Sequence, residues 1–165
     1  MAIARDWALG LRDCYGLDDI ASDRDLDDTL DDLQIEVVRL TSLPAGLRDL
    51  YAEPLLVLPR GQAQPLDRWA KAHVVGHRIL HRGDQLRLAR DFVELQECQA
   101  NHFAWWFLLG DLPHRLRGDR WAIARHVAWL GNVPADCVYR WWGCPVDRPI
   151  ARAVELRSEW LEPAW

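Results

Sequence analysis

The sequence predicts an α+β fold that is mostly helical, with a small sheet of roughly three strands packed on one helix. Two short apolar segments, residues 34–40 and 55–58, have the composition of strands. From Pro65 onward, long stretches without strong breakers are typical of helices. Half of the 165 residues are hydrophobic, which is enough for the core of a single domain spanning residues 1–165.

The first third of the chain predicts one helix and the strands. Apolar residues recur at helical spacing over residues 3–15, so we expect an amphipathic helix there. The acidic segment 23–33 fits either a second short helix or a loop. Residues 34–40 are rich in β-branched side chains and alternate partially, which favours a strand. The leucine-rich run 55–58 is followed by turn residues and predicts a short buried strand.

The remaining two thirds predict a series of helices. Pro65 suits the start of a helix, and Gly76 is the one breaker inside the run that comes after it. Gly76 is expected to permit the close approach of a neighbouring element, because a glycine inside a helix costs about 1 kcal/mol relative to alanine. The helices are expected at about residues 66–81, 90–109 and 120–130, with a short one within 133–142.

Charge and composition exclude several classes of protein. The net charge is −5, so the chain lacks the cationic surface that non-specific nucleic-acid binding needs. No segment approaches the roughly 18 apolar residues of a membrane span, and the N-terminus lacks a signal-peptide pattern. We therefore expect a cytoplasmic protein without a membrane or direct nucleic-acid partner. Its four cysteines are most simply thiols, although a Cys137–Cys144 disulfide is compatible with the spacing.

The predicted helix over residues 66–81 carries the most informative side chains. His73 and His77 are one turn apart and project from the same face. Such a pair alone is commonly an ordinary surface or core pair. The next helix, however, carries Glu97, which would complete a His₂Glu zinc site with a fourth position open for water. Asn101, one turn after Glu97, could orient this carboxylate or a ligand histidine. We expect one zinc ion.

The surrounding residues extend this pattern. The chain reads Ala72-His73-x-x-Gly76-His77-x-x-Leu80-His81, then Glu97-x-x-x-Asn101-x-Phe103-Ala104. This resembles the ImmA/IrrE-type metallopeptidases over roughly residues 30–112. The resemblance implies a minimal zincin fold, in which a short sheet lies over the active-site helix and the metal sits between that helix and the next. It also implies His73, His77 and Glu97 as ligands, with His81 and Asn101 beside them, and a helical extension over about 113–165.

One position departs from that family. The catalytic glutamate directly after the first histidine is replaced by Val74. That glutamate transfers a proton from the metal-bound water to the leaving amine, and valine cannot. General acid–base catalysis contributes about 10²–10⁴-fold, so we expect metal binding with little or no amide cleavage. Glu94, His81 and His102 are the candidates for a substitute base, and each is more commonly a solvated or packing residue.

Three functions fit these observations. The first is a zincin-like metal-binding protein that acts by binding a regulatory protein or peptide. The resemblance implies a helix-turn-helix repressor as partner, because members of that family often cut or engage such repressors. The second is an active zinc-dependent endopeptidase that cleaves a transcriptional repressor with a non-standard base. The third is a metal-free interaction module. The sequence leaves open whether the protein is an enzyme.

Overall fold

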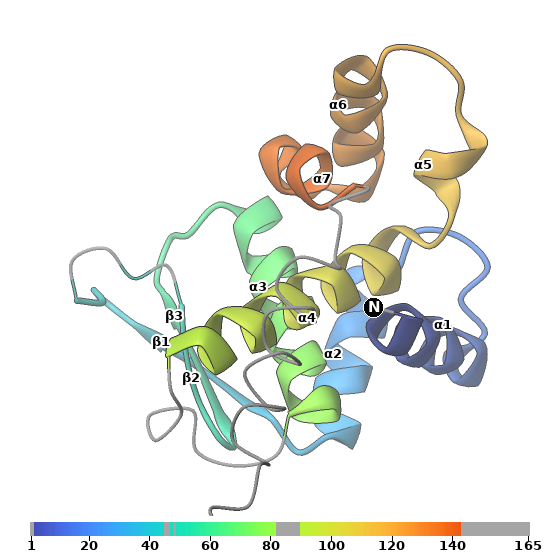
Figure 1. Cartoon of the computed structure of the whole chain (residues 1–165). Coiled ribbons are helices and arrows are strands. Elements are labelled where there is room, and N and C mark those ends of the chain that lie inside the picture. Colours follow the sequence, from blue (N-terminus) through green and yellow to red (C-terminus); the bar gives the residue numbers. More distant parts are fainter. Residues whose placement is uncertain (1, 45–46, 48, 82–89, 143–165) are drawn as a thin grey trace, which may run out of the picture.

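The computed structural model describes residues 2–44, 47, 49–81 and 90–142 and confirms the predicted α+β class (Figure 1). Within them, the chain is mostly helical and contains one three-stranded sheet. The elements run in the order α1 (Ala2–Tyr15), α2 (Asp23–Asp32), β1 (Glu36–Leu40), β2 (Leu50–Ala52), β3 (Leu55–Pro59), α3 (Gln64–Leu80), α4 (Arg90–Leu109), α5 (Leu112–Arg115), α6 (Arg120–Gly131) and α7 (Ala135–Trp141). The predicted tail beyond residue 142 lies outside the described residues.

The acidic segment that fitted either a helix or a loop is the helix α2. Its first turn carries a capping box: the Ser22 hydroxyl accepts from the Asp25 backbone N–H, and the Asp25 carboxylate accepts from the Ser22 N–H. These bonds satisfy two of the amide groups that a helix start leaves unpaired. Two elements were not predicted, the strand β2 and the helix α5, because three- and four-residue elements are too short to show a periodicity.

The sheet has the strand order β1-β3-β2, with β1 parallel and β2 antiparallel to the central β3. Leu56 and Leu58 of β3 are fully buried, and β3 contacts α3. The edge strand β2 brings the Tyr51 ring to 6.5 Å from the His77 ring, in a stacked arrangement. The sheet therefore lies beside the helix that carries the two histidines.

The core forms where α3 packs along α4, with α1 also packed against α4 (Figure 1). Val74 and Val75 of α3 are fully buried, as are Phe103 and Phe107 of α4. Gly76 is the point of closest approach, because a Cβ there would lie 3.0 Å from the Phe103 Cβ. The expectation that this glycine permits close packing is confirmed.

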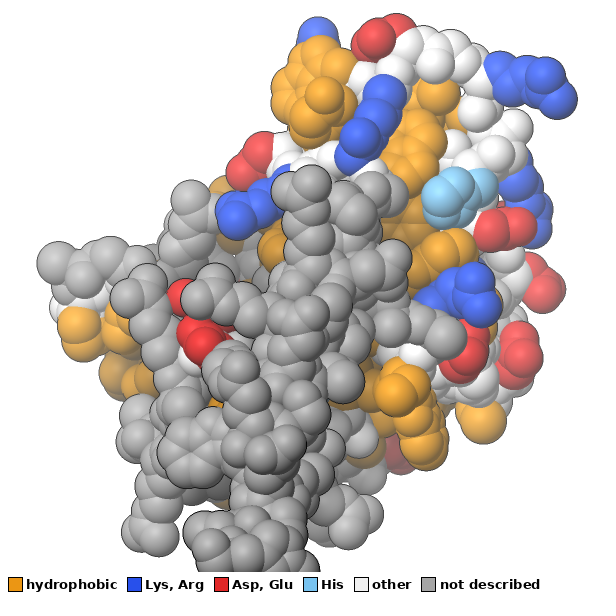
Figure 2. All heavy atoms as spheres, in the orientation of Figure 1, with side chains coloured by type: hydrophobic (Ala, Val, Ile, Leu, Met, Phe, Trp, Pro, Cys, Tyr) orange, Lys and Arg blue, Asp and Glu red, His pale blue; other side chains and the backbone are white. Residues whose placement is uncertain are grey.

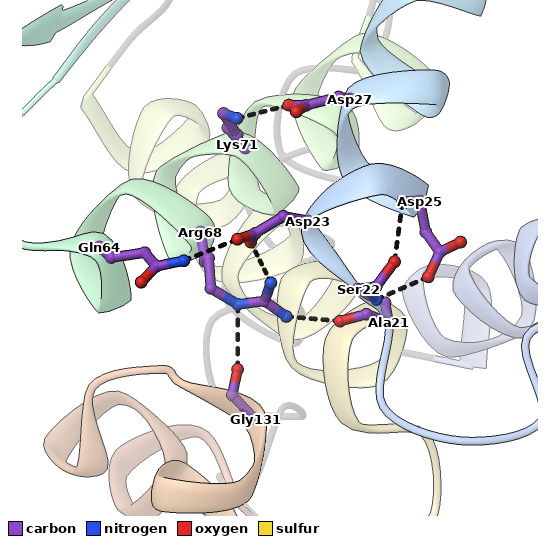
Figure 3. A network of polar contacts seen from close by, with 9 residues as sticks. All are labelled: Ala21, Ser22, Asp23, Asp25, Asp27, Gln64, Arg68, Lys71 and Gly131. Carbon is purple, nitrogen blue, oxygen red and sulfur yellow. Dashed lines mark hydrogen bonds and ion pairs between the residues drawn. The ribbon is translucent and has the colours of Figure 1, made fainter.

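A buried arginine connects three helices (Figure 3). Arg68 of α3 is 6% exposed and donates hydrogen bonds to the carbonyls of Ala21, before α2, and Gly131, at the end of α6. It also forms an ion pair with Asp23 of α2, which accepts a further hydrogen bond from Gln64. Because these partners lie far apart in sequence, Arg68 holds α2 and α6 against α3.

Hydrophobic side chains gather on the surface over α6 and α7, between arginines (Figure 2). Trp129 is 76% exposed, and Trp121 and Tyr139 are also exposed. The guanidinium of Arg120 lies 4.8 Å from the Tyr139 ring centroid. Within the described residues, no helix combines the length and apolar character that crossing a membrane requires.

Candidate metal centre

Two adjacent helices bring three ligand groups to one point. His73 and His77 occupy consecutive turns of α3, and their Nε2 atoms are 3.0 Å apart. Glu97 of α4 places Oε2 3.2 Å from the His73 Nε2 and Oε1 3.2 Å from the His77 Nε2. Ligand atoms of all three residues lie within 4.8 Å of one another. The predicted convergence is confirmed, and this group could hold a metal ion.

The distances between these ligand atoms can be compared with those found around a bound metal ion. Ligand atoms about 2.0–2.1 Å from a tetrahedral zinc lie about 3.3 Å from each other. The observed separations of 3.0 and 3.2 Å are close to that value. The donor set of two imidazoles and a carboxylate is also one that zinc uses. The residues present therefore fit a divalent metal of this kind.

Burial and mutual contacts determine the protonation states of the ligands. Burial lowers the pKa of His77, whose side chain is 4% exposed, and the neighbouring His73 also acts to lower it. For Glu97, burial acts to raise the pKa, but the hydrogen bonds from His73 and His77 outweigh it and hold the pKa well below its usual range. A neutral imidazole and an ionised carboxylate are the forms that bind a metal.

Asn101 links the two helices of the site. Its Oδ1 accepts from the Trp69 Nε1 at 3.1 Å, and its Nδ2 donates to the Glu97 carbonyl at 2.7 Å. The amide thus positions the main chain at Glu97 and the indole of α3. The sequence suggested a bond to the carboxylate or to a ligand histidine, whereas these two hydrogen bonds of the Asn101 amide run to other partners.

His81 ends α3 beside the ligand pair. Its ring centroid lies 5.4 Å from that of His77, and its Nε2 lies 3.2 Å from the Gln96 carbonyl. Burial, together with His77, lowers the pKa of His81 to about 4. The ring is therefore neutral at physiological pH, and its Nε2 donates to that carbonyl. This arrangement supports a role in fixing the position of α4 relative to α3.

The other two candidates for a base are Glu94 and His102, and Val74 occupies the position where the resemblance implies the catalytic glutamate. Val74 is fully buried in the core. Glu94 is exposed on α4, and His102 is 5% exposed, with its ring edge-on to Trp141 at 5.5 Å. Burial lowers the pKa of His102 to about 4. Val74, Glu94 and His102 are not among the described residues that line the cavity beside His73.

That cavity has a volume of about 370 Å³, and His73, Glu97 and Asn101 are among its lining residues. Helix α7 also contributes to the lining, as does Asp49, directly before β2. Both contributions were missed from the sequence, since nothing in a single acidic residue or a short distant helix indicates that it reaches this site. Cys137 also lines the cavity, while Cys144 and the disulfide considered between them lie outside the described residues.

Comparisons with protein-family models, with curated proteins and with solved structures find nothing that matches this chain. The resemblance to the ImmA/IrrE-type metallopeptidases therefore stays a prediction. The geometry of the three ligand groups and of the cavity beside them is the firmer basis for assigning a function.

Proposed function

We propose that this chain is an ImmA/IrrE-like metal-binding protein that holds one zinc ion at His73, His77 and Glu97. The observation that carries the proposal is the convergence of these three ligand groups from α3 and α4. Two nitrogen donors and one oxygen donor favour zinc over magnesium or calcium, which prefer oxygen alone. Bound zinc would polarise a carbonyl oxygen and make a bound water more acidic.

We further propose that the protein acts by binding a peptide or protein segment rather than by cutting it. The position after the first histidine holds the buried Val74, which can neither accept nor donate a proton. The cavity beside His73 gives a ligand access to the metal position. The edge strand β2 lies near the cavity and could pair with an extended segment, as sheet edges commonly do. From the resemblance, the proposed partner is a helix-turn-helix repressor, met inside the cell.

The test is zinc uptake by untagged protein, measured by elemental analysis and by titration calorimetry. One zinc per chain is expected, with an increase in the midpoint temperature of unfolding, because a ligand that binds only the native state stabilises it. His77→Ala and Glu97→Gln should lose most of this binding. His126→Ala is the matched control, since His126 is exposed on α6. Absence of uptake and of any thermal shift would leave the third function, that of a metal-free interaction module.

One observation favours a second candidate function, a zinc-dependent endopeptidase with a non-standard base. Asp49 lines the same cavity as His73 and Glu97, and its charge acts to raise the pKa of His77. Among the carboxylates of the described lining, Asp49 is therefore the candidate to accept a proton in place of the glutamate that the resemblance implies. The test is chelator-sensitive cleavage of a repressor that is retained by Asp28→Asn and lost in Asp49→Asn at full zinc occupancy. Inactivity of the zinc-loaded wild-type protein would exclude this function.

A further inference from the structure

We propose that the cavity beside the metal site selects a ligand with a basic side chain, arginine or lysine. This inference rests on the proposed function, because it concerns the ligand of the same cavity. Four residues that do not ligate the metal carry it: two tryptophans and two aspartates that line the cavity from different elements.

Two tryptophans from different helices contribute aromatic rings to the lining of the cavity. Trp69 of α3 is 7% exposed, and its indole N–H is held by the Asn101 amide. Trp141 of α7 is half-buried and lies edge-on to the His102 ring. Indole rings attract ammonium and guanidinium groups more strongly than other aromatic rings do. Both rings are held by neighbours, so little ordering is needed when a cation enters.

The molecule already contains one contact of this kind. The guanidinium of Arg140 lies 5.3 Å from the Trp141 ring centroid, and Arg140 itself lines the cavity. The Trp141 ring is thus positioned in a way that accepts a guanidinium. A cation brought by a ligand would meet the same type of surface from inside the cavity.

The charges at the cavity favour a cation over an anion. Asp49 enters from the start of the edge strand, and Asp136 from the first turn of α7. Apart from Glu97, which belongs to the ligand set, the described residues of the lining carry two carboxylates and one guanidinium, that of Arg140. Zinc would attract a ligand carboxylate at the metal position itself, whereas a carboxylate placed beside Asp49 and Asp136, away from the metal, would be repelled by both. An arginine or lysine side chain would be attracted by both and could lie against the indoles.

The inference can be tested with small hydroxamates, because the hydroxamate anchors the probe at zinc. One series is acetyl-Ala-X-hydroxamate, and the other is a succinyl hydroxamate coupled to X-Ala-amide, which places X on the other side of the metal. X is arginine, lysine, citrulline or glutamate. Citrulline is the decisive comparison, since it keeps the shape of arginine and lacks the charge. Binding is measured by calorimetry on zinc-loaded protein, with the zinc content checked afterwards.

We expect the arginine probe of at least one series to bind about five- to tenfold more tightly than its citrulline counterpart. Asp136→Asn should reduce this ratio, whereas Arg140→Gln should increase it by removing a like charge. Asp28→Asn is the matched control, because it removes the same charge from the exposed surface of α2. Lysine and arginine probes that both exceed citrulline would show recognition of charge, and arginine alone would show recognition of the planar guanidinium.

Equal affinities for arginine and citrulline in both series, or tighter binding of the glutamate probe, would overturn the inference. Either result would leave the proposed function intact as long as zinc and the hydroxamate group bind. Failure of the protein to bind zinc at all would instead contradict the proposed function, so the two failures are distinguishable.

Discussion

Gly76 of α3 lies against Ala100 of α4 so closely that a Cβ on Gly76 would come within 3.1 Å of the Ala100 Cα and of its carbonyl oxygen. The next residue after Gly76 is the ligand His77, and Ala100 lies one turn after the ligand Glu97. The close approach of the two helices is therefore also what allows the carboxylate to reach the imidazoles. A side chain at position 76 would separate the ligands.

The first prediction concerns this contact. Gly76→Ala should be less stable than the matched variant Gly10→Ala by about 1–3 kcal/mol, because the new methyl group meets backbone atoms. Gly10 lies inside α1 with open space around it, so alanine there should stabilise the protein by up to about 1 kcal/mol. Chemical denaturation measures both. Zinc affinity should fall in Gly76→Ala alone; equal stability and equal zinc affinity of the two variants would contradict the packing described.

The second prediction concerns Val74. Val74 is 0% exposed and sits in the hydrophobic core, so Val74→Glu should destabilise the protein by about 2–4 kcal/mol. Burial should raise the pKa of the new carboxyl, so the loss of stability should grow as the pH rises above about 4.3, the ordinary glutamate value. Val74→Gln should show a loss that does not change with pH in this way. Urea denaturation across this range measures the difference.

The Val74→Glu variant also tests whether the lack of a carboxylate at position 74 is what prevents amide cleavage. If residue 74 reaches the metal position once it carries a carboxylate, zinc-loaded Val74→Glu should gain chelator-sensitive peptidase activity. A folded variant that binds zinc and stays inactive would show that more than the general base has been lost from the site.

The third prediction concerns pH and His102. Burial lowers the pKa of this histidine to about 4, so the unfolded chain binds its proton more readily than the folded protein between about pH 4 and the ordinary value of 6.5. Stability should therefore rise with pH across that window and level off above it, with His102 contributing up to about 3 kcal/mol. His81, whose pKa burial also lowers to about 4, contributes to the same rise, so His102→Phe should reduce the rise without abolishing it, while keeping an aromatic ring against Trp141. His126→Phe, on an exposed histidine of α6, is the comparison variant.

The fourth prediction concerns the arginine that joins three helices. Arg68→Met should destabilise the protein by about 2–3 kcal/mol, because the carbonyls of Ala21 and Gly131 lose their donor while Asp23 remains accessible to water. Arg24→Met is the comparison, since Arg24 forms an exposed pair with Asp28 within α2. Exposed pairs contribute about 0–1 kcal/mol, so thermal unfolding should change little. A similar loss in both variants would mean that the buried network adds nothing.

Long runs without strong breakers were enough to predict the positions of α3 and α4. Helical spacing then predicted the face that two of the candidate ligands share. His73 and His77 project together because four residues nearly complete a helical turn, and that relationship needs no other part of the chain. The choice of His73, His77 and Glu97 as candidate ligands came from these patterns and the family resemblance.

The sequence by itself thus determined the α+β class, the helices that carry His73, His77 and Glu97, and the valine at position 74, where the family resemblance implies a glutamate. Only the tertiary structure decided that Val74 is buried, that Asn101 holds the backbone of Glu97, and that Asp49 and α7 complete the cavity. The physical reason is the range of the interactions involved. A helix is held by hydrogen bonds between residues four apart, so it can be predicted from a short stretch of sequence. The walls of a cavity come from residues that are distant in sequence, and their proximity depends on how whole elements pack.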